Sequence, residues 1–404
     1  MSDITSILHI GAPKCGSSAL QTALSSQPDL RDESGRCYRY TVYREDRKRA
    51  QVLRGRALNL AARMSPYGYV SWPNIGGQIA AEPFWTAARG VLAHGSRRGY
   101  VPILSNEGWI AHADAFAKNL INPDAGATEV VVFVRPPLEW LNAAYWQWGV
   151  WGGLKFDTWL NRPPAQYRLG QQIEAWSRVP GIRLRVRTAK QDVVGAFGDH
   201  YRLDLERQPR SNPSAPPALT GFLLRNRRFR PTAHDSAVEF VFQRWCRVED
   251  GGTLWSFKPR QVQRLRDDLR VEVDRMLEAI DPTDAEALLI DTRWRRMTGY
   301  HDRLNMPLPD LDDRNALARL DTALREGLER CARAAGTEIP QLSSLPSETA
   351  PLEDWDTVIA GVLSALLEAD RAYRLGRLSG SRLGNWVLSR LPGFDVRSIS
   401  REET

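Results

Sequence analysis

The run Ser6-Ile-Leu-His-Ile10 leads directly into Gly11-Ala-Pro-Lys-Cys-Gly16 and then into Ser17-Ser18. The first run is short and apolar, which predicts a buried β-strand. The glycines end it, and the apolar residues over 19–24 share one face of a helix that the two serines begin. A glycine-rich turn between a strand and a helix start favours anion binding, because backbone N–H groups and the positive end of the helix dipole converge there.

Three further runs along the chain have the length and composition of strands. They are Tyr100-Val-Pro-Ile-Leu104, Glu129-Val-Val-Val-Phe-Val134 and Ile182-Arg-Leu-Arg-Val186, and helical stretches separate them. Strands that alternate with helices are typical of βαβ units in a parallel sheet. We therefore predict an α/β fold with a P-loop-type parallel sheet flanked by helices.

The second half of the chain has a mostly helical pattern. Helices are predicted over 259–280 and 313–335, and Gly336 is placed to end the second of them. The sequence Pro307-Leu-Pro-Asp310 has the composition of a boundary. We therefore predict a main domain over 1–308 and a helical C-terminal extension over 309–404.

The turn at 11–16 differs from the nucleotide-binding pattern G-x-x-x-x-G-K-[ST] in the place of its lysine. The two glycines have the required separation, but Ser17 stands at the lysine position and Lys14 lies inside the loop. No convincing acidic strand end for Mg²⁺ accompanies the loop. The pattern therefore predicts a phosphate site that is not a conventional ATP or GTP site. A P-loop kinase remains an alternative, and Mg²⁺-dependent ATP binding would favour it.

The stretch His9-Ile-Gly-Ala-Pro-Lys-Cys-Gly-Ser-Ser-Ala-Leu-Gln21 resembles the 5′-phosphosulfate loop of sulfotransferases that use 3′-phosphoadenosine 5′-phosphosulfate (PAPS). That loop usually reads Pro-Lys-[Ser/Thr]-Gly-[Ser/Thr]-[Ser/Thr], so Cys15 replaces a hydroxyl residue here. The family's second signature is a strand that ends in arginine, with serine eight residues on. Residues 130–148 match the strand, the arginine (Arg135) and the aromatic helix, and they carry Ala143 at the serine position.

Two more stretches follow the order of the family. Val101-Pro-Ile-Leu-Ser-Asn-Glu107 is similar to the strand ending in Ser-x-Glu of bacterial carbohydrate sulfotransferases, and Pro209-Arg-Ser-Asn-Pro-Ser214 resembles the loop after the last core strand. The resemblance covers residues 5–230 in outline. It implies a PAPS-dependent sulfotransferase whose acceptor is a hydroxyl group of a glycan or glycolipid.

The resemblance implies a donor-binding role for each motif residue. Lys14 would stabilise the leaving group, because negative charge develops on the bridging oxygen. The 5′-phosphate would be held by the loop residues Cys15, Gly16, Ser17 and Ser18. Arg135 would bind the 3′-phosphate through its forked guanidinium. Asn142 or a downstream arginine would replace the missing serine hydroxyl, and no metal is expected.

On the acceptor side, Glu107 is the candidate general base, with His112 as the reserve candidate. Glu107 follows a predicted strand, where open α/β sheets have their ligand crevice. His9 lies on the buried strand and is interpreted as a hydrogen-bonded core histidine. A cluster of tryptophans either packs in the core or stacks on sugar rings; it comprises Trp140, Trp146, Trp148, Trp151 and Trp159.

A third interpretation is a non-catalytic relative that binds nucleotide and transfers no sulfate. Ala143 and Cys15 favour this binding module, because both depart from the family's motifs. Lys14, Gly16 and Arg135 oppose it, because they retain them.

Composition and charge narrow the class of protein. The chain has 55 basic and 48 acidic residues, and its net charge of +7 suits an anionic ligand. Six of the basic residues are lysines. Such a skew to arginine is typical of a high-GC genome and does not indicate nucleic-acid binding, so we expect no nucleic-acid partner.

The setting is predicted to be reducing and cytoplasmic. No signal-peptide pattern begins the chain, and no apolar run approaches the ~20 residues of a membrane-spanning helix. The four cysteines form no Cys-x-x-Cys pair, so a disulfide framework and a structural zinc site are not expected.

The tail over 371–404 alternates arginines with leucine, tryptophan and phenylalanine. Such a mixture suits a helix that lies on an anionic membrane, which would place the protein at the inner face of the membrane. Gly376, Gly380 and Gly384 oppose one rigid helix. The alternative is that the tail packs on the catalytic domain or on a second subunit of a homo-oligomer.

Overall fold

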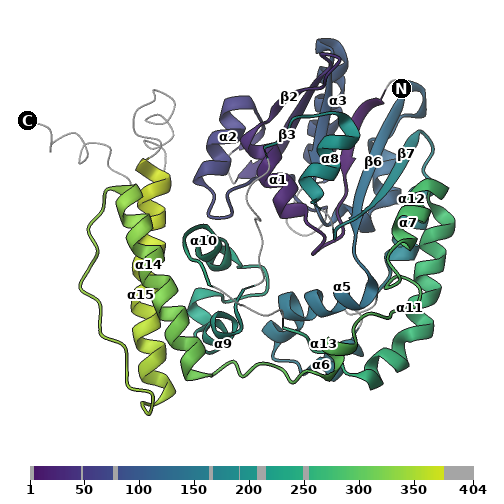
Figure 1. The fold of residues 1–404 in the computed structure, drawn as a ribbon. Helices are drawn as coiled ribbons and strands as arrows, with labels where there is room; N and C mark the ends of the chain where they lie inside the picture. The colour runs from purple at the N-terminus through teal and green to yellow at the C-terminus, as the bar shows by residue number, and fades with distance from the viewer. Residues whose placement is uncertain are drawn as a thin grey trace, which may run out of the picture. The chain divides into compact units, whose positions relative to one another are not determined.

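The computed structural model of the 404-residue chain describes residues 4–46, 49–75, 81–162, 167–190, 192–206, 215–248 and 254–376. The chain divides into two compact units (Figure 1). The first unit comprises Met1–Asn59, Tyr69–Pro209 and Trp255–Leu308, and the second comprises Leu60–Gly68, Arg210–Leu254 and Pro309–Thr404.

These units differ from the predicted division at 308/309. That border separates the two units, but residues 60–68 and 210–254 group with the C-terminal part rather than with the sheet. The reason is packing: helices α9 (Pro217–Arg225) and α10 (Ala237–Trp245) contact α14 (Arg314–Ala335). Their apolar faces thus share a core that is not visible as a composition change along the sequence.

The first unit is built on a mixed, mostly parallel sheet, in which the described strands follow the order β2-β3-β5-β1-β6-β7, with β4 paired to β3. Parallel pairs join β3 to β5, β5 to β1, β1 to β6 and β6 to β7. The strands are β1 (Ile4–His9), β2 (Asp29–Arg31), β3 (Cys37–Asp46), β4 (Arg49–Arg54), β5 (Tyr100–Ser105), β6 (Ala127–Val134) and β7 (Ile182–Thr188).

The α/β class is therefore confirmed, together with the four predicted strands β1, β5, β6 and β7. Sequence analysis missed β2, β3 and β4, which pair antiparallel with one another. In β3, Tyr38, Tyr40 and Val42 alternate along the sequence with the polar residues Arg39 and Thr41, although Thr41 is buried as well. Such alternation of residue types is typical of a strand, whereas the search relied on continuous apolar runs.

Helices cover both faces of the sheet, as the burial of every residue in β5 requires. Helix α3 contacts β1, β3 and β5, α7 and α12 contact β7, and α1 packs with α8 (Figure 1). The helices that lie wholly in this unit are α1 (Ser17–Ser26), α3 (Ala81–Arg98), α4 (Ala113–Asn119), α5 (Pro137–Ala144), α6 (Phe156–Leu160), α7 (Leu169–Ser177), α8 (Val193–Tyr201), α11 (Pro259–Ala279), α12 (Pro282–Leu289) and α13 (His301–Asn305). Helix α2 (Gly55–Met64) spans the border between the units.

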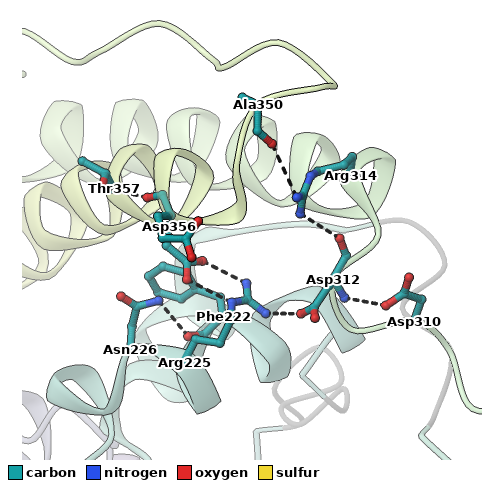
Figure 2. Close-up of polar contacts among 10 residues, drawn as sticks. Phe222, Arg225, Asn226, Asp310, Asp312, Arg314, Ala350, Asp356 and Thr357 are labelled. Carbon is teal, nitrogen blue, oxygen red and sulfur yellow. Dashed lines mark hydrogen bonds and ion pairs between the residues drawn. The ribbon is translucent and has the colours of Figure 1, made fainter.

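The second unit contains α9, α10, α14 and α15 (Leu352–Gly376). The predicted helix over 313–335 is confirmed: the Asp313 carboxylate accepts the Ala316 N–H at 2.6 Å, and Gly336 ends the helix at φ 68°. Figure 2 shows Arg225 on α9 bridging Asp312 and Asp356, the latter at 2.9 Å. This ion-pair group ties α9 to the start of α14 and to α15.

The predicted tail begins inside α15, which continues to Gly376. Arg374 pairs with the buried Asp370 at 2.7 Å, so the start of the tail packs within its own unit. Residues 377–404, which carry most of the predicted membrane-binding pattern, lie outside the described residues. Within the described part of the chain, no helix has the length and apolar character needed to cross a membrane.

Glu129 on β6 is a buried carboxylate that links the sheet to α8. It pairs with His200 Nε2 at 2.8 Å and accepts the Tyr201 hydroxyl at 2.5 Å. Burial alone would raise the pKa of Glu129, but the hydrogen bonds of His200 and Tyr201 outweigh it and hold the pKa below the usual value. The ionised carboxylate therefore stabilises the folded state.

We expect Glu129→Gln to lower the free energy of unfolding by about 1–3 kcal/mol near neutral pH, because His200 and Tyr201 lose a charged acceptor. Since the folded-state pKa is depressed, this contribution is present above the unfolded pKa of about 4.3 and is lost as the pH falls through the folded value. Urea unfolding at neutral and acid pH measures it. The exposed Glu33→Gln is the control, and equal stability of both variants at neutral pH would contradict the prediction.

Candidate active site

The ends of three parallel strands meet at one edge of the sheet. Strand β1 lies between β5 and β6, and His9 is in register with Ser105 on one side and Val131 on the other. The glycine-rich loop, Glu107 and Arg135 follow these strands directly, so they leave the sheet side by side. The charges of Arg135, Glu107 and Lys14 all act on the buried Cys15 thiol. The structure thus brings the three predicted side chains to one place.

The loop has three residues in the left-handed region. Gly11, Lys14 and Gly16 have φ values of 56°, 64° and 90°. A Cβ on Gly11 would lie 2.4 Å from Glu107 Cα, and a Cβ on Gly16 would lie 2.6 Å from Val193 Cγ2. Only glycine fits at both positions, and the loop is therefore held by close packing against β5 and α8.

Lys14 is the non-glycine residue of the loop in this conformation. The left-handed region costs an ordinary residue about 1–2 kcal/mol, and such strain gathers at functional sites. Its ammonium donates to Gln147 Oε1 at 2.9 Å. Trp140 Nε1 donates to the neighbouring Pro13 carbonyl at 2.9 Å. The helix after β6 therefore holds two successive loop residues.

Helix α1 begins after Gly16, and no side chain in the described part of the chain caps it. Its first N–H groups are thus oriented toward the loop, where the helix dipole is positive. Ser17 is buried, and its hydroxyl has no hydrogen-bond partner among the described residues. The Ser18 hydroxyl lies 3.3 Å from the Tyr69 hydroxyl.

Cys15 is fully buried beneath the loop. Burial raises the pKa of its thiol to about 12, although the positive charge of Arg135 opposes the shift. The thiol therefore remains neutral and adds no negative charge to the loop.

Arg135 is half-buried and makes no hydrogen bond or ion pair with any described residue. The nearby Glu139 is instead engaged by Lys190 at 3.0 Å and Arg293 at 3.2 Å. Burial raises the pKa of Glu139, and the charges of Arg293, Arg135 and Arg303 oppose that shift. The guanidinium of Arg135 is thus available to an anion.

Asn142, one of the two proposed substitutes for the missing serine, is buried, and its side-chain oxygen accepts the Ser256 N–H at 2.9 Å, which joins α5 to the segment before α11. Ala143 is half-buried. A phosphate would need a donor, which is the amide nitrogen of Asn142 and not this oxygen. Both alternatives, Asn142 and a downstream arginine, therefore stay predictions, with Arg293 and Arg303 as the nearby arginines.

Glu107 lies exposed at the strand end, on a backbone that its neighbour fixes. Asn106 is buried; its side chain donates to the Trp72 carbonyl and accepts the Gly108 N–H, both at 2.6 Å. His112 begins α4, and burial lowers its pKa. A carboxylate on a rigid backbone is suited to accept a proton.

His9 is a core residue, as predicted. It is fully buried, its Nδ1 lies 2.7 Å from the Ser105 hydroxyl, and burial lowers its pKa to about 4. The neutral ring therefore joins β1 to β5 and takes no part in the charge of the site.

Some tryptophans of the cluster are packed in the core, and the others are accessible enough to stack on sugar rings. Trp151 and Trp159 are buried, and Trp159 packs against Tyr145 and Phe156. Trp140, Trp146 and Trp148 are half-exposed. The core interpretation is thus confirmed for two rings, and sugar stacking stays a prediction for the other three.

Sequence analysis missed Gln147 and Trp140 as loop-binding residues. They lie seven positions apart, and the π-helical turn Tyr145–Gly149 begins between them, so α-helical spacing does not place them on one face. No local sequence signal indicated them. Their reach to Pro13 and Lys14 depends on the tertiary fold. In the described part of the chain, no group of three or more His, Cys, Asp or Glu side chains could hold a metal ion.

We expect Gly11→Ala to destabilise the first unit by more than the about 1–2 kcal/mol that left-handed backbone costs an alanine, because the new Cβ must displace the Glu107 backbone. Gly35→Ala is the matched control: its φ is 85°, and no atom lies within 4 Å of the added Cβ. Urea unfolding measures both, and an equal loss in the two variants would contradict the close packing.

Comparison with known proteins leaves the family open. No family model, curated protein or solved structure matches the chain. The function is therefore argued from the motifs and from the geometry of the site.

Proposed function

We propose that the chain is a sulfotransferase that moves a sulfuryl group from PAPS to a hydroxyl group of a glycan or glycolipid. The observation that carries the proposal is the meeting, at one sheet edge, of a left-handed loop lysine and a half-buried arginine that has no ion-pair partner among the residues described. Two separate cationic groups, Lys14 in the loop and Arg135, suit a donor that carries a 5′-phosphosulfate and a separate 3′-phosphate. We also propose that the sheet is of the P-loop type.

The loop and Arg135 would bind anions in different ways. The loop offers backbone N–H groups at the start of α1, where the dipole is positive and no side-chain cap competes among the described residues. The planar guanidinium of Arg135 can donate two parallel hydrogen bonds to two phosphate oxygens. The loop would therefore take the 5′-phosphosulfate and Arg135 the 3′-phosphate.

In the proposed reaction, the acceptor oxygen forms a bond to sulfur as the bond from sulfur to the bridging phosphate oxygen breaks. Negative charge grows on that bridging oxygen, and the Lys14 ammonium would stabilise it. Glu107 would take the proton of the acceptor hydroxyl. The products are the sulfate ester, adenosine 3′,5′-bisphosphate and the proton held by Glu107.

A glycan acceptor is supported by the aromatic helix after Arg135. Trp140 is tied to the loop through Pro13, and it packs with Trp148 at a ring distance of 6.3 Å. Half-exposed indole rings beside a reaction site suit the apolar faces of sugar rings.

The second candidate function is a nucleotide-binding module without sulfate transfer. One observation favours it: Ala143 lacks the hydroxyl that the resemblance would require at this position. This departure affects the 3′-phosphate side only, whereas the loop and Lys14 would serve the transfer step.

Calorimetry with adenosine 3′,5′-bisphosphate tests donor binding. We expect binding in the presence of EDTA, and Arg135→Ala should weaken it by about 10- to 100-fold, the value of a charge-assisted hydrogen bond. Adenosine 5′-monophosphate should bind the wild type and Arg135→Ala equally, because it lacks the 3′-phosphate. The exposed Arg98→Ala is the control. Loss of binding on chelation would support the kinase alternative.

Transfer from ³⁵S-labelled PAPS to a panel of glycans tests catalysis. Lys14→Ala should lower turnover by ~10²-fold or more, as for other removed transition-state donors. Glu107→Gln should abolish transfer and leave bisphosphate affinity unchanged, because the base touches the acceptor only.

The exposed Lys118→Ala is the control for Lys14. If His112→Ala abolishes transfer and Glu107→Gln does not, the assignment of the base is wrong. Nucleotide binding without transfer to any acceptor would support the binding-module alternative.

A further inference from the structure

We propose that Gln147 is a positioning residue, which holds the Lys14 ammonium at the mouth of the loop while leaving its charge intact. The inference rests on the proposed function, because it assigns the means by which Lys14 is presented to the donor. It starts from the bond of 2.9 Å between Lys14 Nζ and Gln147 Oε1.

The backbone conformations at Lys14 and Gln147 set the directions in which the two side chains leave the chain. Lys14 has a left-handed φ of 64°, so the loop sets the direction in which its side chain leaves. Gln147 lies in the π-helical turn Tyr145–Gly149 that follows α5. Such turns are rare and frequent at functional sites, because the extra residue re-aims the side chains beyond it. A regular α-helix would direct this side chain differently.

A second hydrogen bond holds the loop next to the bond between Lys14 and Gln147. Trp140 Nε1 donates to the Pro13 carbonyl at 2.9 Å, one residue before Lys14. Gly149, at the end of the π-helical turn, is packed so closely that a Cβ would lie 2.5 Å from Tyr145 Cδ2. The turn and the loop are therefore anchored next to the bond, and the bond is more than a meeting of two mobile side chains.

The amide is chemically suited to this role. Its oxygen accepts one of the three ammonium N–H groups and carries no net charge. This bond therefore does not cancel the positive charge of the ammonium, whereas a bond to a carboxylate would. An ordered lysine also avoids the loss of rotamer freedom, up to about 2 kcal/mol, when the anion arrives.

Chemical labelling of the nucleotide-free protein tests the inference. The acylation rate of Lys14 by an N-hydroxysuccinimide acetate, followed by peptide mapping, is compared with those of Lys118 and Lys155 in the same sample. Gln147→Ala should speed Lys14 labelling by about threefold or more, because one hydrogen bond is lost. Gln147→Glu should slow it, because a neighbouring carboxylate favours the charged, unreactive ammonium.

These opposite changes, confined to Lys14, are not expected from a general structural effect. The glutamate side chain in Gln147→Glu has nearly the same size as glutamine, so this variant remains informative if Gln147→Ala folds poorly. Gln171→Ala, at an exposed position on α7, is the control. Lys14 labelling that is unchanged in both Gln147 variants, or that shifts in the same direction in both, overturns the inference.

A binding measurement separates this inference from the proposed function. In calorimetry with adenosine 3′,5′-bisphosphate, Gln147→Glu should weaken affinity about tenfold or more, because the added charge repels the anion, and Gln147→Ala should change it by less than about threefold. Equal affinities of Gln147→Glu and the wild type would overturn the inference. If the two Gln147 variants show the opposed changes in labelling and the wild type binds no bisphosphate, the proposed function alone is overturned.

Discussion

The parallel pairing of β1 with both β5 and β6 sets the position of every group at the candidate site. Parallel strands point the same way, so the segments that follow them must leave the sheet at one edge. His9 in register with Ser105 and Val131 makes this alignment specific. Groups from distant parts of the sequence therefore meet at this edge.

The glycine-rich loop is shaped by its neighbours as much as by its own sequence. Glu107 and Val193 leave no space for a Cβ at Gly11 and Gly16. The indole of Trp140 holds the Pro13 carbonyl. Protein interiors are close-packed. A loop that packs between a strand end and a helix therefore has little freedom to move into the space where an anion would bind.

Charge is distributed unevenly between the site and the rest of the molecule. Several arginines are committed to carboxylates that fix the fold: Arg187 pairs with the buried Asp284 at 2.6 Å, and Arg374 pairs with Asp370 at 2.7 Å. Arg135 has no such partner among the described residues, and the amide that holds Lys14 carries no charge. The arginine-rich composition thus stabilises the fold in general, whereas Arg135 is not committed to a carboxylate within the described part of the chain.

Some features follow from local sequence. The apolar runs, the strand-to-helix glycine turn and the helix end at Gly336 act over a few neighbouring residues, and they appear as predicted. The order of the strands also brings Lys14, Glu107 and Arg135 to one edge once a parallel sheet is assumed. These predictions succeed because hydrophobic periodicity and backbone preference are local properties.

Other features depend on the tertiary structure alone. Residues 60–68 and 210–254 join the C-terminal helices because their apolar faces fit α14, a matter of packing between distant segments. The Asn142 side-chain oxygen accepts the Ser256 N–H, and Gln147 reaches Lys14 because a π-helical turn re-aims it. The amino-acid sequence by itself determined the elements and the chemical groups. Which of those groups are already satisfied and which remain available was decided only by long-range contacts, because a hydrogen bond between distant residues leaves no local pattern.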